Sequence, residues 1–225
     1  MDNKMHYQFE KEWDELFSIG ILRRYRAGEV IYNQGAYDIG IYGLRHGVIR
    51  NCVYFPNGAE KTLCLLKAPS LTGETSLIDG GSSLCAAVAY TDVEVVVLSS
   101  DLANRFLDNH PKMMRLMLEI FSLKMRGIQM QTESIMLALP QRLAKMLINF
   151  RSYGVFTHSE NGKRLICTHE QLAAFLGSSR PKITMALNTF ERQRLIKKGR
   201  GYIEILDMPG LQALLNNQNY KNQNF

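Results

Sequence analysis

The side chains best suited to chemistry lie between residues 168 and 200, where basic and hydroxylic groups are close together. Thr168 and Gln171 have the spacing of a capping box, which begins a helix by satisfying its first free backbone N–H groups. An apolar helical face follows to residue 176, and then Gly177-Ser178-Ser179 predicts a tight turn. A second helix is predicted at 180–192, and LIKKGRGYIEILD after it is typical of two short strands. This order of elements predicts a winged helix-turn-helix.

Such a unit would place the first turn of its second helix against base edges in the major groove of DNA. Arg180 stands where a bidentate contact with guanine is possible, and Pro181 is tolerated in a first turn but offers no donor. For Lys182 we expect phosphate contact, and the lysine and arginine of the wing are either phosphate contacts or solvated charges. The candidate DNA-binding residues are Ser179, Arg180, Lys182, Thr184, Thr168, Lys198 and Arg200.

The distribution of charge agrees with this assignment. Residues 139–225 hold 13 Lys and Arg against 5 Asp and Glu, whereas residues 1–138 hold 14 against 16. A concentrated basic region suits nucleic acid, because each neutralised phosphate releases condensed counterions. A solvated basic surface is the alternative that charge alone leaves open.

The N-terminal part of the chain has a different pattern. Residues 20–99 consist of short β-branched and aromatic runs separated by glycine, which predicts a compact all-β roll or barrel. Pro56-Asn57-Gly58 is the best local hairpin signal, since Asn-Gly accepts the positive φ of a tight turn. A short helix around 9–17 is expected to precede the roll.

Beyond Ser99 the apolar residues recur at helical spacing. Ser99 or Ser100 caps a short helix, Pro111 allows a new start, and a long helix is predicted to run to Leu137. Its apolar residues recur at helical spacing, with Gly127 filling one step, and predict a seam that packs on a second copy of the chain. The residues of this seam are Leu116, Ile120, Leu123, Met130 and Leu137. The alternative is a helix that lies on its own β domain. A further amphipathic helix is predicted at 140–150.

Taken together, these pieces resemble the cyclic-AMP receptor/FNR (Crp/Fnr) family of bacterial transcription regulators over nearly the whole chain. The matching motifs are Gly28-Glu29-x-Ile31-x-x-Gln34-Gly35, Gly73-Glu74-x-x-Leu77, the long helix and LAAFLGSSRPKITMAL. The resemblance implies a homodimer that binds a near-palindromic site in double-stranded DNA, with RNA polymerase as a further partner. The expected fold class is α+β, with an effector-sensing jelly roll like a cyclic-nucleotide-binding domain (1–110), a dimerisation helix (111–138) and a winged helix-turn-helix (139–225).

The residues that contact cyclic AMP in members of the family are not all present in this chain. Members that bind cyclic AMP have an Arg-Ser pair on the phosphate, where this chain has Ser83-Leu84, and hydroxylic residues on the long helix, where it has Gly127-Ile128. A buried phosphate without a cation would be badly desolvated, so the expected effector is another small molecule. The candidate pocket consists of Gly73, Glu74, Thr75, Ser83, Leu84, Gly127 and Ile128. The alternative is a cyclic-nucleotide-responsive regulator with an atypical phosphate-binding loop, for which Lys124 and Arg126 are the first cations to consider.

Other classes of function find less support in the residues. The sequence contains no G-x-S-x-G motif, P-loop or metal-binding helix that would indicate an enzyme. A complete helix-turn-helix argues against a nucleotide-binding module that serves another partner. An FNR-type iron–sulfur cluster would need a group of cysteines near the N-terminus, but no cysteine precedes Cys52. Nothing in the spacing recommends His6, His46 or Cys85 as a haem ligand. We therefore expect no cofactor and no metal. Without a visible targeting segment or long apolar run, the expectation is a cytoplasmic protein that does not enter a membrane.

Overall fold

The computed structural model of the chain describes residues 9–37, 40–153, 157–158 and 164–216. Tertiary contacts divide the chain into two compact units, Met1–Met125 and Arg126–Phe225. The boundary falls inside one long helix, α5 (Pro111–Glu133), where the sequence analysis expects a separate dimerisation segment. The first part of α5 therefore belongs to the N-terminal unit, and only its end belongs to the C-terminal unit.

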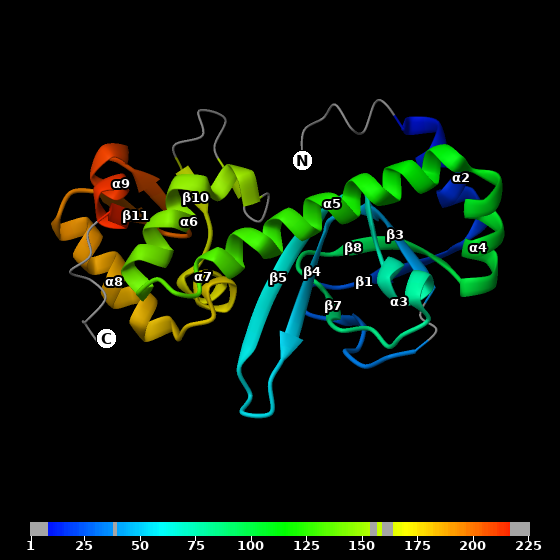
Figure 1. Ribbon diagram of the computed structural model, residues 1–225, viewed down its shortest axis with the longest axis horizontal. Coiled ribbons are helices and arrows are strands. Elements are labelled where there is room, and N and C mark those ends of the chain that lie inside the picture. The colour runs from blue at the N-terminus through cyan, green and yellow to red at the C-terminus, as the bar shows by residue number, and fades with distance from the viewer. Residues whose placement is uncertain (1–8, 38–39, 154–156, 159–163, 217–225) are drawn as a thin grey trace. The chain divides into compact units, whose positions relative to one another are not determined.

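The first unit is a β-roll, whose described residues form two four-stranded antiparallel sheets (Figure 1). Leu44 and Val95 of one sheet share a buried core with Ile49 of the other. The predicted all-β roll is confirmed. The strand order is β1 (Ile21–Tyr25), β8 (Val93–Leu98), β3 (Ile41–His46), β6 (Ser70–Thr72) in one sheet, and β2 (Val30–Tyr32), β7 (Ala86–Ala89), β4 (Val48–Tyr54), β5 (Glu60–Lys67) in the other.

The predicted turn at Pro56-Asn57-Gly58 joins β4 to β5. Gly58 has φ +79°, which a glycine adopts without steric cost. The Phe55 N–H donates to the Ala59 carbonyl at 2.9 Å, and the Asn57 side-chain oxygen accepts the Ala59 N–H at 3.0 Å. The hairpin prediction is thus confirmed.

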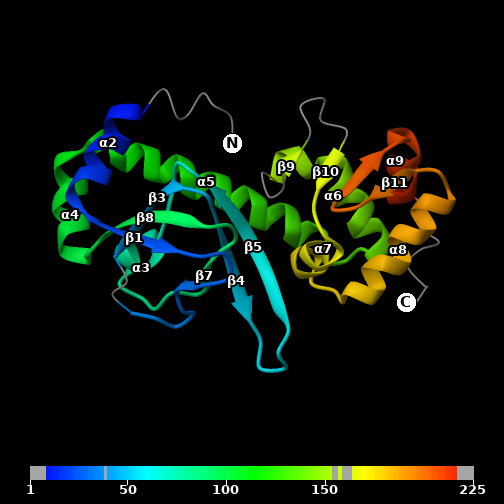
Figure 2. The same cartoon turned by 180° about the vertical axis from the view of Figure 1, so that it is seen from behind.

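Three helices cover the β1–β8–β3–β6 sheet, and Figures 1 and 2 show them gathered at one end of the roll. They are α2 (Glu10–Ile19), α4 (Ser100–Asn109) and the first part of α5. The Ser99 hydroxyl caps α4 by accepting the Leu102 N–H. Trp13, Leu16 and Phe106 are among the side chains that these helices bury against Leu71 and Leu98 of the sheet.

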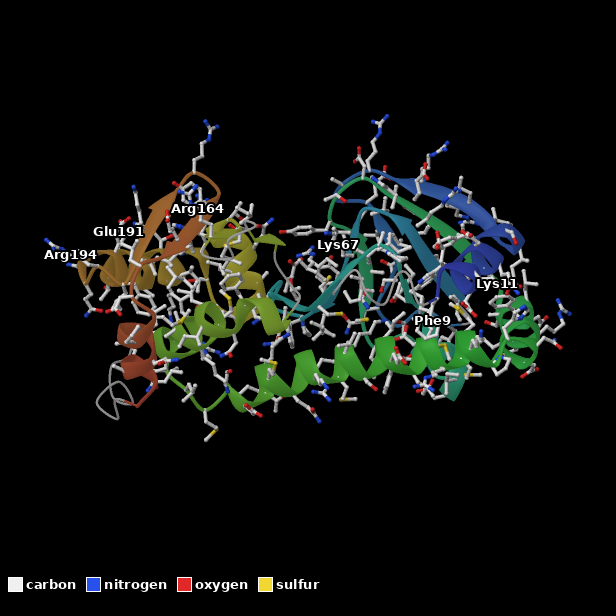
Figure 3. All side chains as sticks on the ribbon, turned by 90° about the horizontal axis from the view of Figure 1, so that it is seen from above. Phe9, Lys11, Lys67, Arg164, Glu191 and Arg194 are labelled. Atoms are coloured by element: carbon white, nitrogen blue, oxygen red, sulfur yellow. The ribbon has the colours of Figure 1, made fainter. Side chains whose placement is uncertain are left out.

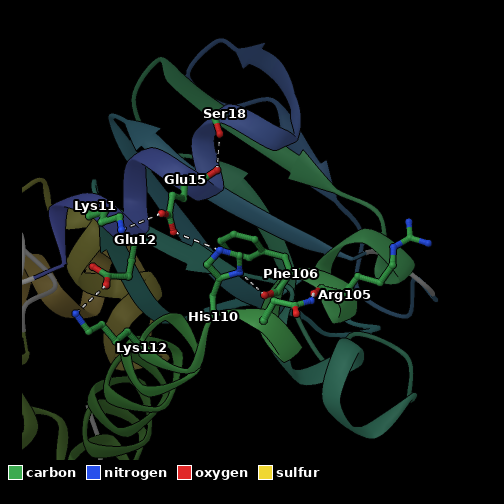
Figure 4. Close-up of polar contacts among 9 residues, drawn as sticks. Lys11, Glu12, Glu15, Ser18, Arg105, Phe106, His110 and Lys112 are labelled. Atoms are coloured by element: carbon green, nitrogen blue, oxygen red, sulfur yellow. Dashed lines mark hydrogen bonds and ion pairs between the residues drawn. The ribbon is translucent and has the colours of Figure 1, made fainter.

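Polar contacts tie α2 to the corner between α4 and α5 (Figure 4). His110, the C-cap of α4, stacks on Phe106 with ring centroids 4.0 Å apart, and its Nε2 lies 3.4 Å from a Glu15 oxygen. Lys112 of α5 lies 3.8 Å from Glu12 of α2. The start of α5 is therefore held by the N-terminal unit.

This packing corrects the predicted dimer seam. Leu116 and Ile120 are 0% and 1% exposed in the core shared by the helices and the sheet, and Leu137 lies beyond the end of α5 at Glu133. The assignments of Leu116 and Ile120 are wrong, because the stripe selected from the sequence is largely the one that the roll itself buries, and the part of Leu137 in a dimer stays a prediction. Leu123 is exposed and Met130 is half-buried. A different apolar face of α5 is open, with Leu118, Phe121, Met125 and Ile128 exposed.

The second unit combines helices with a small sheet (Figure 2). The described strands of this sheet are antiparallel and have the order β11–β12–β10–β9. Its buried side chains include Leu143, Leu147 and Phe150 of α6 and Leu211 of α9. In chain order the elements are α6 (Leu139–Tyr153), β9 (Thr157–His158), β10 (Arg164–Ile166), α7 (His169–Leu176), α8 (Arg180–Arg192), β11 (Ile196–Gly199), β12 (Tyr202–Ile205) and α9 (Met208–Asn216). The α+β class and the predicted succession of two helices and a wing are confirmed.

Candidate nucleic-acid interface and effector site

The α7–turn–α8 segment has the geometry that its sequence predicts. The Thr168 hydroxyl accepts the Gln171 N–H at 3.2 Å, and the Gln171 side-chain oxygen accepts the Thr168 N–H at 2.7 Å, so both halves of the capping box are present. Gly177 ends α7 with φ 60° and ψ 49°, a left-handed conformation that favours glycine. Thr168 thus has a structural role at the start of α7.

Helix α8 presents its basic residues to solvent because its apolar stripe faces inward. Ile183, Ala186, Leu187 and Phe190 are buried, whereas Arg180, Pro181, Lys182 and Met185 are exposed. Within the part of the chain that the structure describes, no carboxylate pairs with the Arg180 or Lys182 side chain. Ser179 is the N-cap by its backbone, but its exposed hydroxyl does not cap the helix. Arg180 and Lys182 are therefore available to an anionic ligand.

The Thr184 hydroxyl, by contrast, already has partners. It donates to the Arg180 carbonyl at 2.9 Å, and the His169 ring nitrogen Nδ1 lies 2.9 Å from it. Since a hydroxyl has a single proton to donate, Thr184 has no free donor for a base edge. His169 was missed by the sequence analysis, because its contact depends on the angle between α7 and α8, which no local pattern gives.

The two predicted phosphate contacts of the wing, Lys198 and Arg200, differ in whether an acidic side chain already pairs with them. The Lys198 ammonium lies 3.0 Å from Glu191 of α8, a residue labelled in Figure 3, and it also contacts the Asn188 side chain. Hydrogen bonds from the Lys198 backbone N–H and from its ammonium hold the pKa of Glu191 below its usual value. Arg200 is exposed at the turn between β11 and β12, where Gly201 has φ +78°. Arg200 is therefore open to a ligand, and Lys198 is already paired.

In the first unit, the predicted effector residue Glu74 has a partner from α5. It is the first residue of α3 (Glu74–Asp79), and its carboxylate accepts a hydrogen bond of 2.8 Å from the Lys124 ammonium. The two side chains are 7% and 10% exposed, and Lys124 also donates to the Leu71 carbonyl at 2.9 Å. Lys124 was considered in the sequence only as a cation that might have been overlooked, and the structure places it directly on Glu74.

A group of buried polar side chains lies near this ion pair. The Tyr32 hydroxyl and Thr72 Oγ1 are 2.6 Å apart, and Asn51 donates to the same Thr72 oxygen at 3.1 Å. Burial raises the pKa of the Cys64 thiol to about 12, although the charge of Lys124 opposes this shift. The Asn51 side-chain oxygen is buried and has no hydrogen-bond partner among the residues that the structure describes. Polar groups from β2, β4, β5 and β6 thus lie near the Lys124–Glu74 pair.

The other predicted pocket residues are placed less favourably. Ser83 is buried, but its hydroxyl donates to the Cys85 carbonyl at 2.8 Å. Leu84 is 73% exposed, and Thr75 is exposed as well. Gly73 has φ +95° and a Cβ there would meet the Gly40 carbonyl, so this glycine serves the backbone. Gly127 and Ile128 belong to the second unit, and their part in the pocket stays a prediction.

Among the described residues, no group of three or more His, Cys, Asp or Glu side chains is arranged to hold a metal ion. The helices in the described ranges include none with the length and apolar character needed to cross a bilayer. His6 lies outside the described residues.

Comparison with known proteins identifies both units. Residues 22–110 match the cyclic nucleotide-binding domain, and residues 141–214 match the Crp-like helix-turn-helix domain. A curated relative, the cyclic AMP receptor protein of Thermus thermophilus, is 24% identical over 193 residues, covering 85% of this chain and 87% of that protein.

Solved structures agree with these matches. A transcriptional regulator of the CRP/FNR family from Thermus thermophilus is 26% identical, with a TM-score of 0.68 over 88% of this chain and 100% of that one. The c-di-GMP-responsive regulator CLP of Xanthomonas campestris shares the fold, with a TM-score of 0.76 over 88% of this chain and 99% of that one at 16% identity. The chain belongs to the Crp/Fnr family of DNA-binding transcriptional regulators.

Proposed function

We propose that this regulator binds a near-palindromic DNA site as a homodimer and that Arg180 reads a base in each half-site. The observation that carries the proposal is the first turn of α8, where Arg180 and Lys182 are exposed and have no acidic partner among the described residues, while the apolar stripe of the helix is buried. Exposed arginine at the start of such a helix suits a bidentate contact with guanine. Selection of binding sites from random DNA tests the proposal, and a folded protein that enriches no sequence contradicts it.

The proposed dimer uses the open face of α5. Leu118, Phe121 and Met125 are three and four residues apart and exposed, and Ile128 continues the spacing. This is the periodicity of a coiled-coil seam, and so many large apolar side chains on one helix face favour a partner with the same face. A second copy of the chain is that partner, because a seam of this kind is self-complementary about a two-fold axis.

We further propose that the effector is a small molecule other than cyclic AMP. A cyclic phosphate needs a cation, yet Leu84 supplies none, and Lys124 is already neutralised by Glu74. Relatives named for cyclic AMP and for c-di-GMP indicate that this fold serves more than one ligand. Output through RNA polymerase is part of the same proposal.

The second candidate is a cyclic-nucleotide-responsive regulator with an atypical loop, and one observation favours it. Lys124 is a buried cation next to Glu74, and it could turn to a phosphate if Glu74 took a different partner. Calorimetric titration with cyclic AMP separates the two candidates. Micromolar binding of cyclic AMP by the wild-type protein favours the nucleotide, and no heat of binding favours another effector.

A further inference from the structure

Three elements of the second unit bring nitrogen groups together at His169, the first residue of α7. Its Nδ1 lies 2.9 Å from Thr184 Oγ1 of α8. Arg180 of α8 and Lys198 of β11 are close enough for their charges to act on the imidazole. Thr184 Oγ1 also donates to the Arg180 carbonyl, and Arg180 is a residue of the proposed DNA-binding surface, so His169 lies beside that surface.

The hydrogen bonds determine which nitrogen of His169 carries a proton. Thr184 has one hydroxyl proton, and that proton is donated to the Arg180 carbonyl at 2.9 Å. The Thr184 oxygen must then accept from His169, so the His169 proton is on Nδ1. Nε2 of the neutral ring consequently has a lone pair and no proton.

The surroundings of His169 hold it in this neutral form. Burial is the main cause that lowers its pKa below the ordinary value, and the positive charges of Lys198 and Arg180 lower it further. Thr184 is uncharged, and the carboxylate of Glu191 is engaged by Lys198. The free protein therefore favours an unprotonated Nε2 on His169.

We infer that His169 is a DNA-contacting and positioning residue: Nδ1–H holds the first turn of α8 through Thr184, and Nε2 takes up a proton when a DNA phosphate binds. This inference depends on the proposed DNA-binding function and adds a linked proton to it. A phosphate close to Arg180 would offset the repulsion of its charge and favour the imidazolium, which then donates to the phosphate.

The sign of the pH dependence follows from linkage. The pKa of His169 is lower in the free protein than in the DNA complex, so the complex binds more protons. DNA affinity should therefore be highest at low pH and fall as pH rises through the pKa of the complex. A single proton limits the slope to about tenfold in affinity per pH unit.

Fluorescence anisotropy with a labelled duplex that carries the selected site, measured from pH 6 to 8.5 at constant ionic strength, tests the inference. His169→Asn keeps an amide N–H near the Nδ1 position but cannot titrate, and it should abolish the slope. Thr184→Val removes the acceptor and should lower affinity at every pH with the slope retained. His46→Asn, at an exposed histidine of the first unit, is the matched control and should keep the wild-type slope.

The outcomes separate this inference from the function on which it rests. A wild-type protein that binds DNA with no slope, or a slope that survives in His169→Asn, overturns the role of His169 and leaves DNA binding intact. A folded wild-type protein that binds no DNA overturns both. If His169→Asn does not fold, NMR titration of the wild-type His169 ring with and without DNA decides, and a pKa that DNA leaves unchanged or lowers overturns the inference.

Discussion

The two units use their basic residues in opposite ways. In the second unit, Arg180, Lys182 and Arg200 are exposed and have no acidic partner in the described chain. In the first unit, Lys124 is buried and its charge is satisfied by Glu74 and the Leu71 carbonyl. Exposed cations without partners can release counterions from a polyanion, whereas a neutralised buried pair can accept only a ligand that replaces one of its partners. A positive side chain therefore indicates an anion site only when its own structure leaves it free.

The largest expected effect comes from breaking the buried pair. Lys124→Met leaves the Glu74 carboxylate buried without a partner and should lower the free energy of unfolding of the first unit by about 3–5 kcal/mol. Urea denaturation followed by the fluorescence of Trp13, the one tryptophan of the chain, reports this unit. Arg115→Met removes an exposed helical pair with Glu119 and is the control, with an expected change of about 0.5 kcal/mol or less. Equal effects of the two variants would contradict the contrast between buried and exposed cations.

The next effect concerns the open and the buried stripes of α5. Phe121→Glu places a carboxylate in the proposed seam and should raise the dimer dissociation constant at least about 100-fold, which corresponds to about 2.7 kcal/mol. Leu116→Ala, on the buried stripe, should cost about 2–5 kcal/mol of unfolding free energy and leave the dimer intact. Sedimentation equilibrium measures the first effect, and denaturation measures the second. A dimer that tolerates Phe121→Glu but dissociates in Leu116→Ala would restore the seam predicted from the sequence.

The range of the contacts explains which parts could be predicted from the sequence. The capping box joins residues three apart, and the α7–α8 turn needs one glycine, so local pattern was sufficient for the helix-turn-helix. The ion pair at Glu74 joins residues 50 apart, and the His169 contact joins two helices, so both required the tertiary fold. The seam on α5 could not be chosen from the sequence, because the helix has apolar residues on two faces and only the packing of Leu116 and Ile120 shows which one is covered.

A smaller effect is expected at the first turn of α8. Arg180→Ala should cost about 1–3 kcal/mol on the selected DNA site and relax the preference at one base pair of each half-site. Its affinity for unrelated DNA should change much less. Site selection with the wild-type protein and the variant measures both. An unchanged preferred sequence in Arg180→Ala would mean that Arg180 only contacts phosphate and that Lys182 or DNA shape supplies the specificity.

The smallest effect separates the two basic residues of the wing. Arg200 is exposed and has no ion-pair partner in the described part of the chain, so Arg200→Ala should weaken binding to all sequences alike and reduce the slope of log affinity against log salt by about 1. Lys198 is 22% exposed and held by Glu191 and Asn188, so Lys198→Ala removes no free cation and should leave that slope nearly unchanged. Both slopes follow from titrations of one labelled duplex at several salt concentrations. If Lys198→Ala reduces the slope as much as Arg200→Ala does, Lys198 must leave Glu191 when DNA binds, and pairing in the free protein would no longer decide which cations reach phosphate.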